Sequence, residues 1–187
     1  MTTTKISFCS PGDGGYDEKS GNRPACNLQS IEVSKYLCGM LSVYSDTYYM
    51  KQALVEAEKA FDAGEVPVGA VIVSENRIIA RAHNQTEQLT DVTAHAEIMA
   101  ITAAASHLGS KYLPDCTLYV TLEPCLMCTG ALSWAQIGRI AYGASDEKRG
   151  FMLYGGKSLL HPKTKLEMGI LEAECADLMK RFFKARR

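Results

Sequence analysis

Two short motifs, thirty residues apart, bring together side chains that bind metals and move protons. The first contains His95 and Glu97, and the second contains Cys125 and Cys128 directly after Pro124. One imidazole nitrogen and two thiolates make three zinc ligands, and a catalytic zinc keeps its fourth position for water. Zinc lowers the pKa of such a water to about 7. Glu97 need not be a ligand, so we expect it to carry protons beside that water.

The cysteine pair also has two other interpretations. Cys-x-x-Cys occurs in redox proteins and as half of structural zinc sites. A redox pair needs no histidine–glutamate motif upstream, and a structural site needs a fourth ligand. None of the remaining candidate ligands shows ligand spacing, namely Cys116, Cys175, His83, His107 and His161. The sequence therefore favours one catalytic zinc ion per chain over redox chemistry and over a non-enzymatic structural-zinc module.

Hydrophobic periodicity predicts the elements that must position these motifs. It predicts four helices, over residues 46–63, 94–108, 124–136 and 171–185. It predicts five strands, over residues 66–73, 77–82, 117–122, 139–143 and 165–170. Both motifs then lie at helix starts, where the helix dipole stabilises a thiolate. The order of elements predicts an α/β fold, a three-layer α/β/α sandwich with a five-stranded mixed sheet.

Composition and charge exclude several broad classes of protein. Of the 187 residues, 47% are hydrophobic, and no apolar run approaches the ~20 residues of a membrane helix. The N-terminal segment lacks the basic start and apolar stretch of a secretory signal. Seven cysteines without such a signal indicate the reducing cytoplasm. The net charge is −1, but residues 139–187 carry 11 basic and six acidic side chains, so a polyanion would meet this part first.

The chain is expected to divide near residue 45. Residues 1–30 are rich in Gly, Ser, Pro and polar residues and have no sustained period, and residues 31–44 are more apolar but short. We therefore expect residues 1–44 to be a disordered leader. Their zero net charge speaks against an extra RNA-binding arm. A further hypothesis is that most of this leader belongs to an over-extended reading frame whose true start is Met40. Residues 45–187 are then the folded domain.

The segments around both motifs resemble the bacterial tRNA adenosine deaminases, which belong to the cytidine-deaminase-like zinc hydrolases. The resemblance covers about residues 46–187 and is carried by VPVGAVIV (66–73), HN (83–84), TAHAEIMAI (93–101), LYVTLEPCLMCTGAL (118–132), IGRIAYGASDEK (137–148) and the basic C-terminal segment. These enzymes convert the wobble adenosine of a tRNA anticodon to inosine. The resemblance implies the same reaction on a tRNA anticodon stem-loop, with no role for DNA, by a homodimeric zinc-dependent deaminase domain over 45–187. The helix over 124–136 is apolar on more than one face, which is consistent with a buried dimer contact; a fully internal helix would have the same pattern.

The resemblance also assigns roles to individual residues. It implies that zinc is held by His95, Cys125 and Cys128 and that Glu97 moves the proton. Its substrate-binding positions correspond to Asn84, the backbone N–H of Ala96, Val66, Pro67 and Asp146. For two of these positions a structural role is the alternative to substrate binding: Asn84 could be a turn residue, and Asp146 could be a capping residue.

Two features leave the substrate open. The family often has Thr-Gly-Ala after the loop lysine, whereas this chain has Arg149, Gly150 and Phe151. Phe151 could stack on a flipped base or fill the core beneath the loop. Four cations are candidates for the RNA backbone, Lys148, Lys180, Arg181 and Lys184; the alternative is a solvated helix face, although Phe182 and Phe183 are expected to dock the last helix. A deaminase of a free base or nucleotide, such as guanine or cytosine, is the alternative function, and it would not need these cations.

Overall fold

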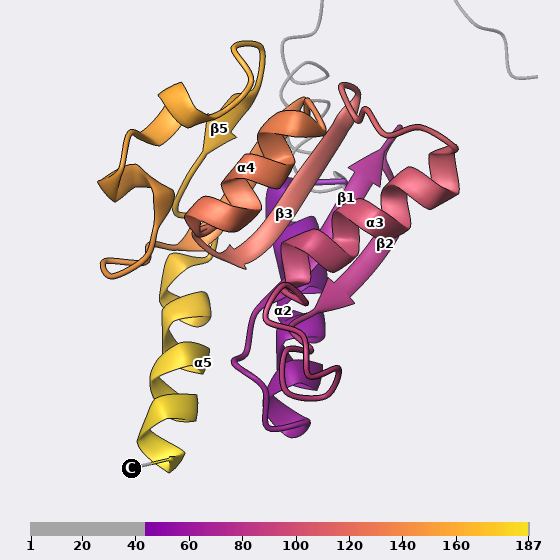
Figure 1. Ribbon diagram of the computed structural model, residues 1–187. Coiled ribbons are helices and arrows are strands. Elements are labelled where there is room, and N and C mark those ends of the chain that lie inside the picture. Colours follow the sequence, from indigo (N-terminus) through magenta and orange to yellow (C-terminus); the bar gives the residue numbers. More distant parts are fainter. Residues whose placement is uncertain (1–43, 187) are drawn as a thin grey trace, which may run out of the picture. The chain divides into compact units, whose positions relative to one another are not determined.

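The computed structural model describes residues 44–186, which form one mixed β-sheet with helices on both faces (Figure 1). The five strands are β1 (Gly69–Ser74), β2 (Arg77–His83), β3 (Cys116–Leu122), β4 (Arg139–Ala144) and β5 (Lys165–Glu167). Their order across the sheet is β2-β1-β3-β4-β5. β1 pairs antiparallel with β2 and β3, whereas β3, β4 and β5 run parallel. The predicted fold class and the five-stranded mixed sheet are confirmed.

Two helices cover each face of the sheet. The four helices are α2 (Asp46–Asp62), α3 (Ala96–Leu108), α4 (Leu126–Trp134) and α5 (Glu172–Ala185). α3 and α4 share one hydrophobic cluster with Ala70 and Ile72 of β1, and α2 and α5 share the other with Val71 and Val73. Successive strand residues point to opposite faces, so β1 is buried on both sides. This explains why its sequence is a continuous apolar run and does not alternate.

α2 lies against the sheet with very little space between them. The Ser45 side chain accepts a hydrogen bond from the Tyr48 backbone N–H at 3.1 Å, which starts the helix. A Cβ atom at Gly69 would come within 2.1 Å of the Ala53 carbonyl oxygen. Any side chain at that position would therefore push α2 away from β1.

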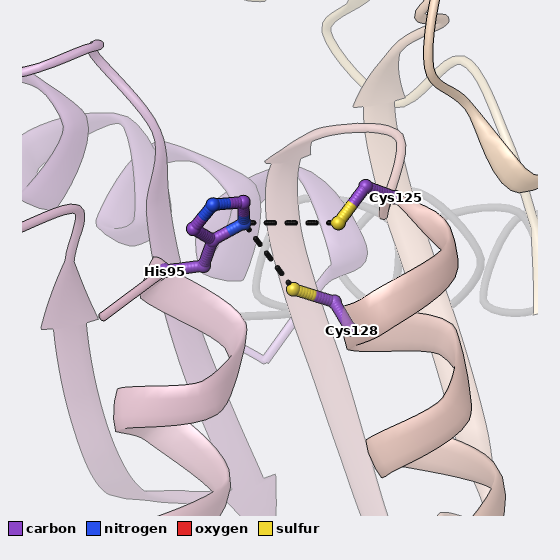
Figure 2. A group of neighbouring side chains, drawn as sticks. All are labelled: His95, Cys125 and Cys128. Atoms are coloured by element: carbon purple, nitrogen blue, oxygen red, sulfur yellow. Dashed lines mark hydrogen bonds between the residues drawn. The ribbon is translucent and has the colours of Figure 1, made fainter. Parts of the chain in front are cut away.

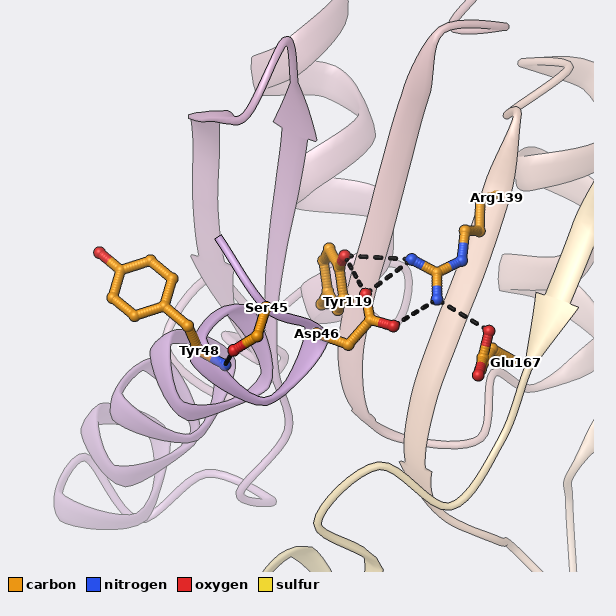
Figure 3. A network of polar contacts seen from close by, with 6 residues as sticks. All are labelled: Ser45, Asp46, Tyr48, Tyr119, Arg139 and Glu167. Carbon is orange, nitrogen blue, oxygen red and sulfur yellow. Dashed lines mark hydrogen bonds and ion pairs between the residues drawn. The ribbon is translucent and has the colours of Figure 1, made fainter. Parts of the chain in front are cut away.

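A polar network ties the start of α2 to three strands (Figure 3). Arg139 on β4 donates two hydrogen bonds of 2.7 Å to the two carboxylate oxygens of Asp46. The Tyr119 hydroxyl on β3 donates to the same carboxylate at 2.6 Å, and Arg139 also pairs with Glu167 on β5 at 2.8 Å. The Arg139 hydrogen bond keeps the pKa of Asp46 below its usual value even though partial burial raises it. The folded domain is therefore anchored at Asp46, its first helical residue.

Several predicted boundaries differ from the structure. The first strand begins at Gly69 and not at residue 66, α4 covers Leu126–Trp134 and not 124–136, and the edge strand covers only Lys165–Glu167. The long loop after β4 holds two short 3₁₀ helices, η1 (Phe151–Leu153) and η2 (Gly156–Leu159). None of the helices in the described part is long and apolar enough to cross a membrane. The predicted leader lies almost wholly outside the described residues.

Candidate metal centre and substrate loops

Three metal-binding side chains converge between the N-terminal ends of α3 and α4 (Figure 2). The Nδ1 atom of His95 lies 3.7 Å from the Sγ atom of Cys125 and 3.5 Å from that of Cys128. A tetrahedral zinc with bonds of about 2.1 Å to nitrogen and 2.3 Å to sulfur separates these atoms by roughly 3.6 Å. The three ligand atoms all lie within 4.8 Å of one another. The residues present therefore fit a zinc ion.

Helix geometry explains why these side chains meet. His95 and Cys125 are the N-cap residues of α3 and α4, and both have extended backbone conformations. An N-cap side chain points past the helix end, where the unpaired backbone N–H groups favour negative charge. Cys128 lies one turn later on α4 and is fully buried. The two helices thus present a nitrogen and two sulfurs to one point.

The charges of the centre suit a cation. Hydrogen bonding from Cys128 lowers the pKa of the Cys125 thiol to about 4, so Cys125 is a thiolate at neutral pH. The same hydrogen bond and burial raise the pKa of Cys128. The hydrogen bond with Cys125 also raises the pKa of His95. A bound cation would take the place of the protons that these three groups share in its absence.

Glu97 lies inside this centre and is not one of the three grouped ligands. Its side chain is 4% exposed and contacts the Cys128 thiol. Burial raises its pKa to about 7. A carboxyl group with a pKa near neutrality can both accept and release a proton at that pH. Glu97 therefore lies beside the three grouped side chains, and its role as proton carrier stays a prediction.

The loop that carries the predicted substrate-binding residue Asn84 follows β2 and is held by a buried carboxylate. The Asn84 side chain is 5% exposed, and its Nδ2 atom donates to Glu65 at 3.0 Å and to Thr86 at 3.1 Å. The Gln85 N–H donates to the Ala94 carbonyl at 3.0 Å, so Asn84 lies beside the chain that leads into His95. Sequence reasoning missed Glu65; the only signal was a single acidic residue directly before an apolar strand.

The other predicted pocket residues lie near the start of β1 and α3. Val66 is half-buried and packs on the same hydrophobic cluster as Ala96, whereas Pro67 is buried. Both precede β1, because the strand begins only at Gly69. Ala96 is the first residue of α3, so its backbone N–H is one of the unpaired donors of that helix end.

The second loop, residues 145–150, lies against the cysteine motif. The Glu123 carboxylate accepts the backbone N–H groups of Asp146 at 3.0 Å and Met152 at 2.9 Å. Gly150 forms a β-bridge with Cys125. The Asp146 Oδ1 atom accepts the N–H groups of residues 148 and 149, as its capping alternative requires. Sequence reasoning missed Glu123 as well, although it lies within the cysteine motif.

Phe151 belongs to the core. It is fully buried and makes an edge-to-face contact with Tyr142, with ring centroids 6.3 Å apart. A ring that stacks on a flipped base must offer a face to it. The burial therefore corrects the placement of Phe151 among the substrate-binding residues and supports its packing role.

The candidate RNA-binding cations are all exposed. Lys148 lies in the second loop, and the other three, Lys180, Arg181 and Lys184, lie on α5. Phe182 docks this helix on Phe61, with ring centroids 5.7 Å apart. The expectation that Phe183 docks as well is wrong, because it is 49% exposed. In Figure 1, α5 continues beyond the end of β3, the end that leads into the metal centre.

Comparison with known proteins decides the family. The profile of the MafB19-like deaminases matches residues 44–187, more than three quarters of the chain. The chain belongs to the MafB19-like deaminase family. It is 48% identical over 145 residues to a tRNA-specific adenosine deaminase of Aquifex aeolicus, covering 75% of this chain and 95% of that one.

Two solved structures are also similar. One comes from studies of A-to-I editing by tRNA:A34 deaminases at the wobble position; it is 45% identical, has a TM-score of 0.66, and the match covers 71% of this chain and 99% of that one. The other is a guanine deaminase from Bacillus subtilis, 42% identical with a TM-score of 0.50, over 52% of this chain and 62% of that one. The likeness to the first extends over far more of the fold.

Proposed function

We propose that this chain is a zinc-dependent hydrolase that converts adenosine to inosine at the wobble position of a tRNA anticodon. The observation that carries the proposal is the convergence of His95, Cys125 and Cys128 around buried Glu97, in a chain 48% identical to a tRNA-specific adenosine deaminase. One zinc ion per chain, held by these three ligands, would act as a Lewis acid toward the water that reacts.

The reaction follows from the position and pKa of Glu97. Its carboxylate takes a proton from the attacking water, whose oxygen forms a bond to C6 of adenine. Glu97 delivers that proton to the neighbouring ring nitrogen, N1. Glu97 then moves the second proton of that water from the new C6 hydroxyl to the amino nitrogen. The bond between C6 and the amino nitrogen breaks, ammonia leaves, and the C6 oxygen becomes the carbonyl oxygen of inosine. Water and adenosine are consumed, and inosine and ammonia are formed.

The two loops would hold the nucleotide. Asn84 offers an amide to the base or its ribose, and Val66 and Pro67 line or support the base pocket. The Ala96 N–H lies at the end of α3, where it can stabilise the oxygen that becomes bonded to C6. Asp146 contacts the neighbouring nucleotide through the carboxylate oxygen that its capping bonds leave free. Lys148, Lys180, Arg181 and Lys184 bind backbone phosphates.

The second candidate function is deamination of a free base, favoured by the likeness to the guanine deaminase. The experiment that separates them incubates purified protein with an anticodon stem-loop that carries A34, with the same stem-loop carrying G34, and with free adenosine, cytidine and guanine. We expect inosine only from the A34 stem-loop. Product from free guanine and none from RNA would establish the alternative.

We further propose that two copies of this chain form a homodimer through α4 and the loop after β4. Trp134 is 85% exposed, and Leu126 and Met127 are exposed on the same helix. Met152, Leu153 and Tyr154 add exposed apolar surface. An apolar patch of this kind on a folded domain is typical of an interface. Sedimentation should give a dimer for the unmodified chain and a monomer for Trp134→Glu. A tRNA substrate and two cysteines without a disulfide, Cys125 and Cys128, also indicate a cytoplasmic enzyme.

A further inference from the structure

The Glu65 carboxylate is almost completely buried and has no basic partner among its hydrogen bonds. It is 1% exposed. One oxygen, Oε1, accepts the backbone N–H groups of Glu87 at 2.9 Å and Gln88 at 2.8 Å. The other, Oε2, accepts from Asn84 Nδ2 at 3.0 Å and from the Thr86 hydroxyl at 3.2 Å. Four donors therefore take the place of a positive charge.

This arrangement leaves Asn84 a single orientation. An ionised carboxylate only accepts hydrogen bonds, so only the Nδ2 end of the Asn84 amide can face Glu65. Burial raises the pKa of Glu65, but its hydrogen bonds outweigh that effect and the pKa is lowered, so the group is ionised at neutral pH. Thr86 supports the same orientation, because its hydroxyl gives its proton to Glu65 and accepts from Asn84.

The other end of the amide is thereby free for a ligand. Asn84 Oδ1 accepts no hydrogen bond from residues 44–186. It is also not one of the side-chain oxygens in this range that are fully buried and lack a hydrogen-bond partner. The Gln85–Ala94 backbone bond places this amide beside the entrance to α3, where the ligand His95 lies. A carbonyl oxygen at this place that is not fully buried and has no protein donor can pair with a ligand donor, such as an amino group or a ribose hydroxyl.

We propose that Glu65 is a positioning residue that fixes the Asn84 amide so that its oxygen, and not its nitrogen, meets the substrate. The inference rests on the proposed function, because the contact between Asn84 and the nucleotide is part of that proposal. Glu65 itself touches no substrate. Through Asn84, Glu65 selects a substrate group that donates a hydrogen bond over one that accepts it. If the Asn84 amide were turned over, its Nδ2 atom would face the donor on the substrate, and two donors would oppose each other.

Glu65→Gln tests the proposal because glutamine has the same shape and can keep most of the network. Its oxygen can retain both backbone donors, while its amide nitrogen now faces Asn84 and forces that amide to turn over. We expect the melting temperature and zinc content to stay close to those of the unmodified chain. We expect kcat/KM on the A34 stem-loop to fall about 10- to 100-fold, the loss that follows when one hydrogen bond is replaced by two opposed donors.

A second variant restores the acceptor without restoring Glu65. In the double variant Glu65→Gln with Asn84→Asp, the introduced amide donates to the introduced carboxylate, whose second oxygen faces the substrate. We expect about a tenfold recovery of kcat/KM relative to Glu65→Gln alone. Asn84→Asp alone should be the least stable of the set, because it places two carboxylates in contact. Glu56→Gln is the matched control: Glu56 is 3% exposed, but its partners are the side chains of Lys59, Arg81 and His83 and do not include Asn84, so kcat/KM should not change.

The outcomes separate the two proposals. Unchanged kcat/KM in Glu65→Gln, no recovery in the double variant, or loss of fold in both would overturn the positioning role. If the unmodified chain does not act on the stem-loop, the proposed function fails. The contact is then judged by melting temperatures alone: the four chains form a double-mutant cycle, and additive effects of the two substitutions would show that Glu65 does not orient Asn84.

Discussion

Gly150→Ala is predicted to damage the fold by disturbing a carboxylate and not by filling empty space. A Cβ atom at position 150 would lie 2.3 Å from Cδ and Oε1 of Glu123 and 2.5 Å from its Oε2. Carbon and oxygen atoms without a bond between them do not approach that closely, so the carboxylate or the loop must move by about 1 Å. Either movement breaks the hydrogen bonds that Glu123 accepts from Asp146 and Met152.

The size of the effect follows from those two bonds. A hydrogen bond to a charged group contributes about 1.5–3 kcal/mol to stability. Relaxation of the loop recovers part of this, so we expect a loss of about 2–4 kcal/mol. A domain of about 140 residues has an unfolding entropy of roughly 0.3 kcal/mol per degree, so each kcal/mol lowers the melting temperature by about 3 °C. Gly150→Ala should therefore melt about 6–12 °C lower.

The assay is calorimetric melting of the zinc-loaded protein, with Gly130→Ala as the matched control. Gly130 lies within α4, and a Cβ atom there would meet nothing within 4 Å. Alanine is the better helix former by about 0.5–1 kcal/mol, so this control should melt slightly higher than the unmodified chain. A Gly150→Ala variant that melts within 1 °C of the unmodified chain would refute the reasoning.

Three further predictions concern the proton carrier, the anchor of α2 and the basic helix. Glu97→Ala should retain zinc but lose deamination by at least ~10²–10⁴-fold, measured as inosine formed per minute; turnover near the original rate would remove Glu97 from the mechanism. The lowered pKa of Asp46 means that its stabilisation is present above about pH 3.8 and is lost as the pH falls through the lower folded value. Asp46→Asn should therefore flatten the acid limb of a melting temperature–pH profile, and an unchanged limb would contradict the role of Arg139. Alanine at Lys180, Arg181 and Lys184 should reduce the log–log salt slope of stem-loop binding by about one unit for each phosphate that α5 no longer binds, whereas an unchanged slope would indicate a solvated face.

The sequence predicted the structure best for features that depend on a single short segment of the chain. The order of helices and strands follows from periodicity within single segments, and each metal-binding motif is contained in one helix start. Cys125 and Cys128 face the same point because they are three residues apart on one helix. The meeting of both motifs required only that two helix starts lie at the same end of a sheet. These features were therefore predicted correctly.

The missed residues depend on interactions between distant segments. Glu65 binds donors 19 to 23 residues later in the chain, and Glu123 binds donors 23 and 29 residues later. No local pattern distinguishes these glutamates from solvent-exposed ones. The same reason applies to Phe151, whose two roles could be separated only by its packing against Tyr142. The start of the first strand was imprecise because residues 66–68 are apolar without joining the sheet.

The two buried glutamates, Glu65 and Glu123, have a structural role that differs from that of the exposed cations. Each holds a loop beside the metal ligands through N–H and hydroxyl groups, without an arginine or lysine among its partners. Cationic partners there would compete with zinc for the thiolates and would attract RNA phosphates into the centre. Neutral donors hold the loops in place before the substrate arrives, which reduces the ordering cost of binding. Three of the four candidate RNA-binding cations, Lys180, Arg181 and Lys184, lie on α5. The fourth, Lys148, lies in the second loop, where its side chain is exposed and the Glu123 carboxylate is held by backbone N–H groups.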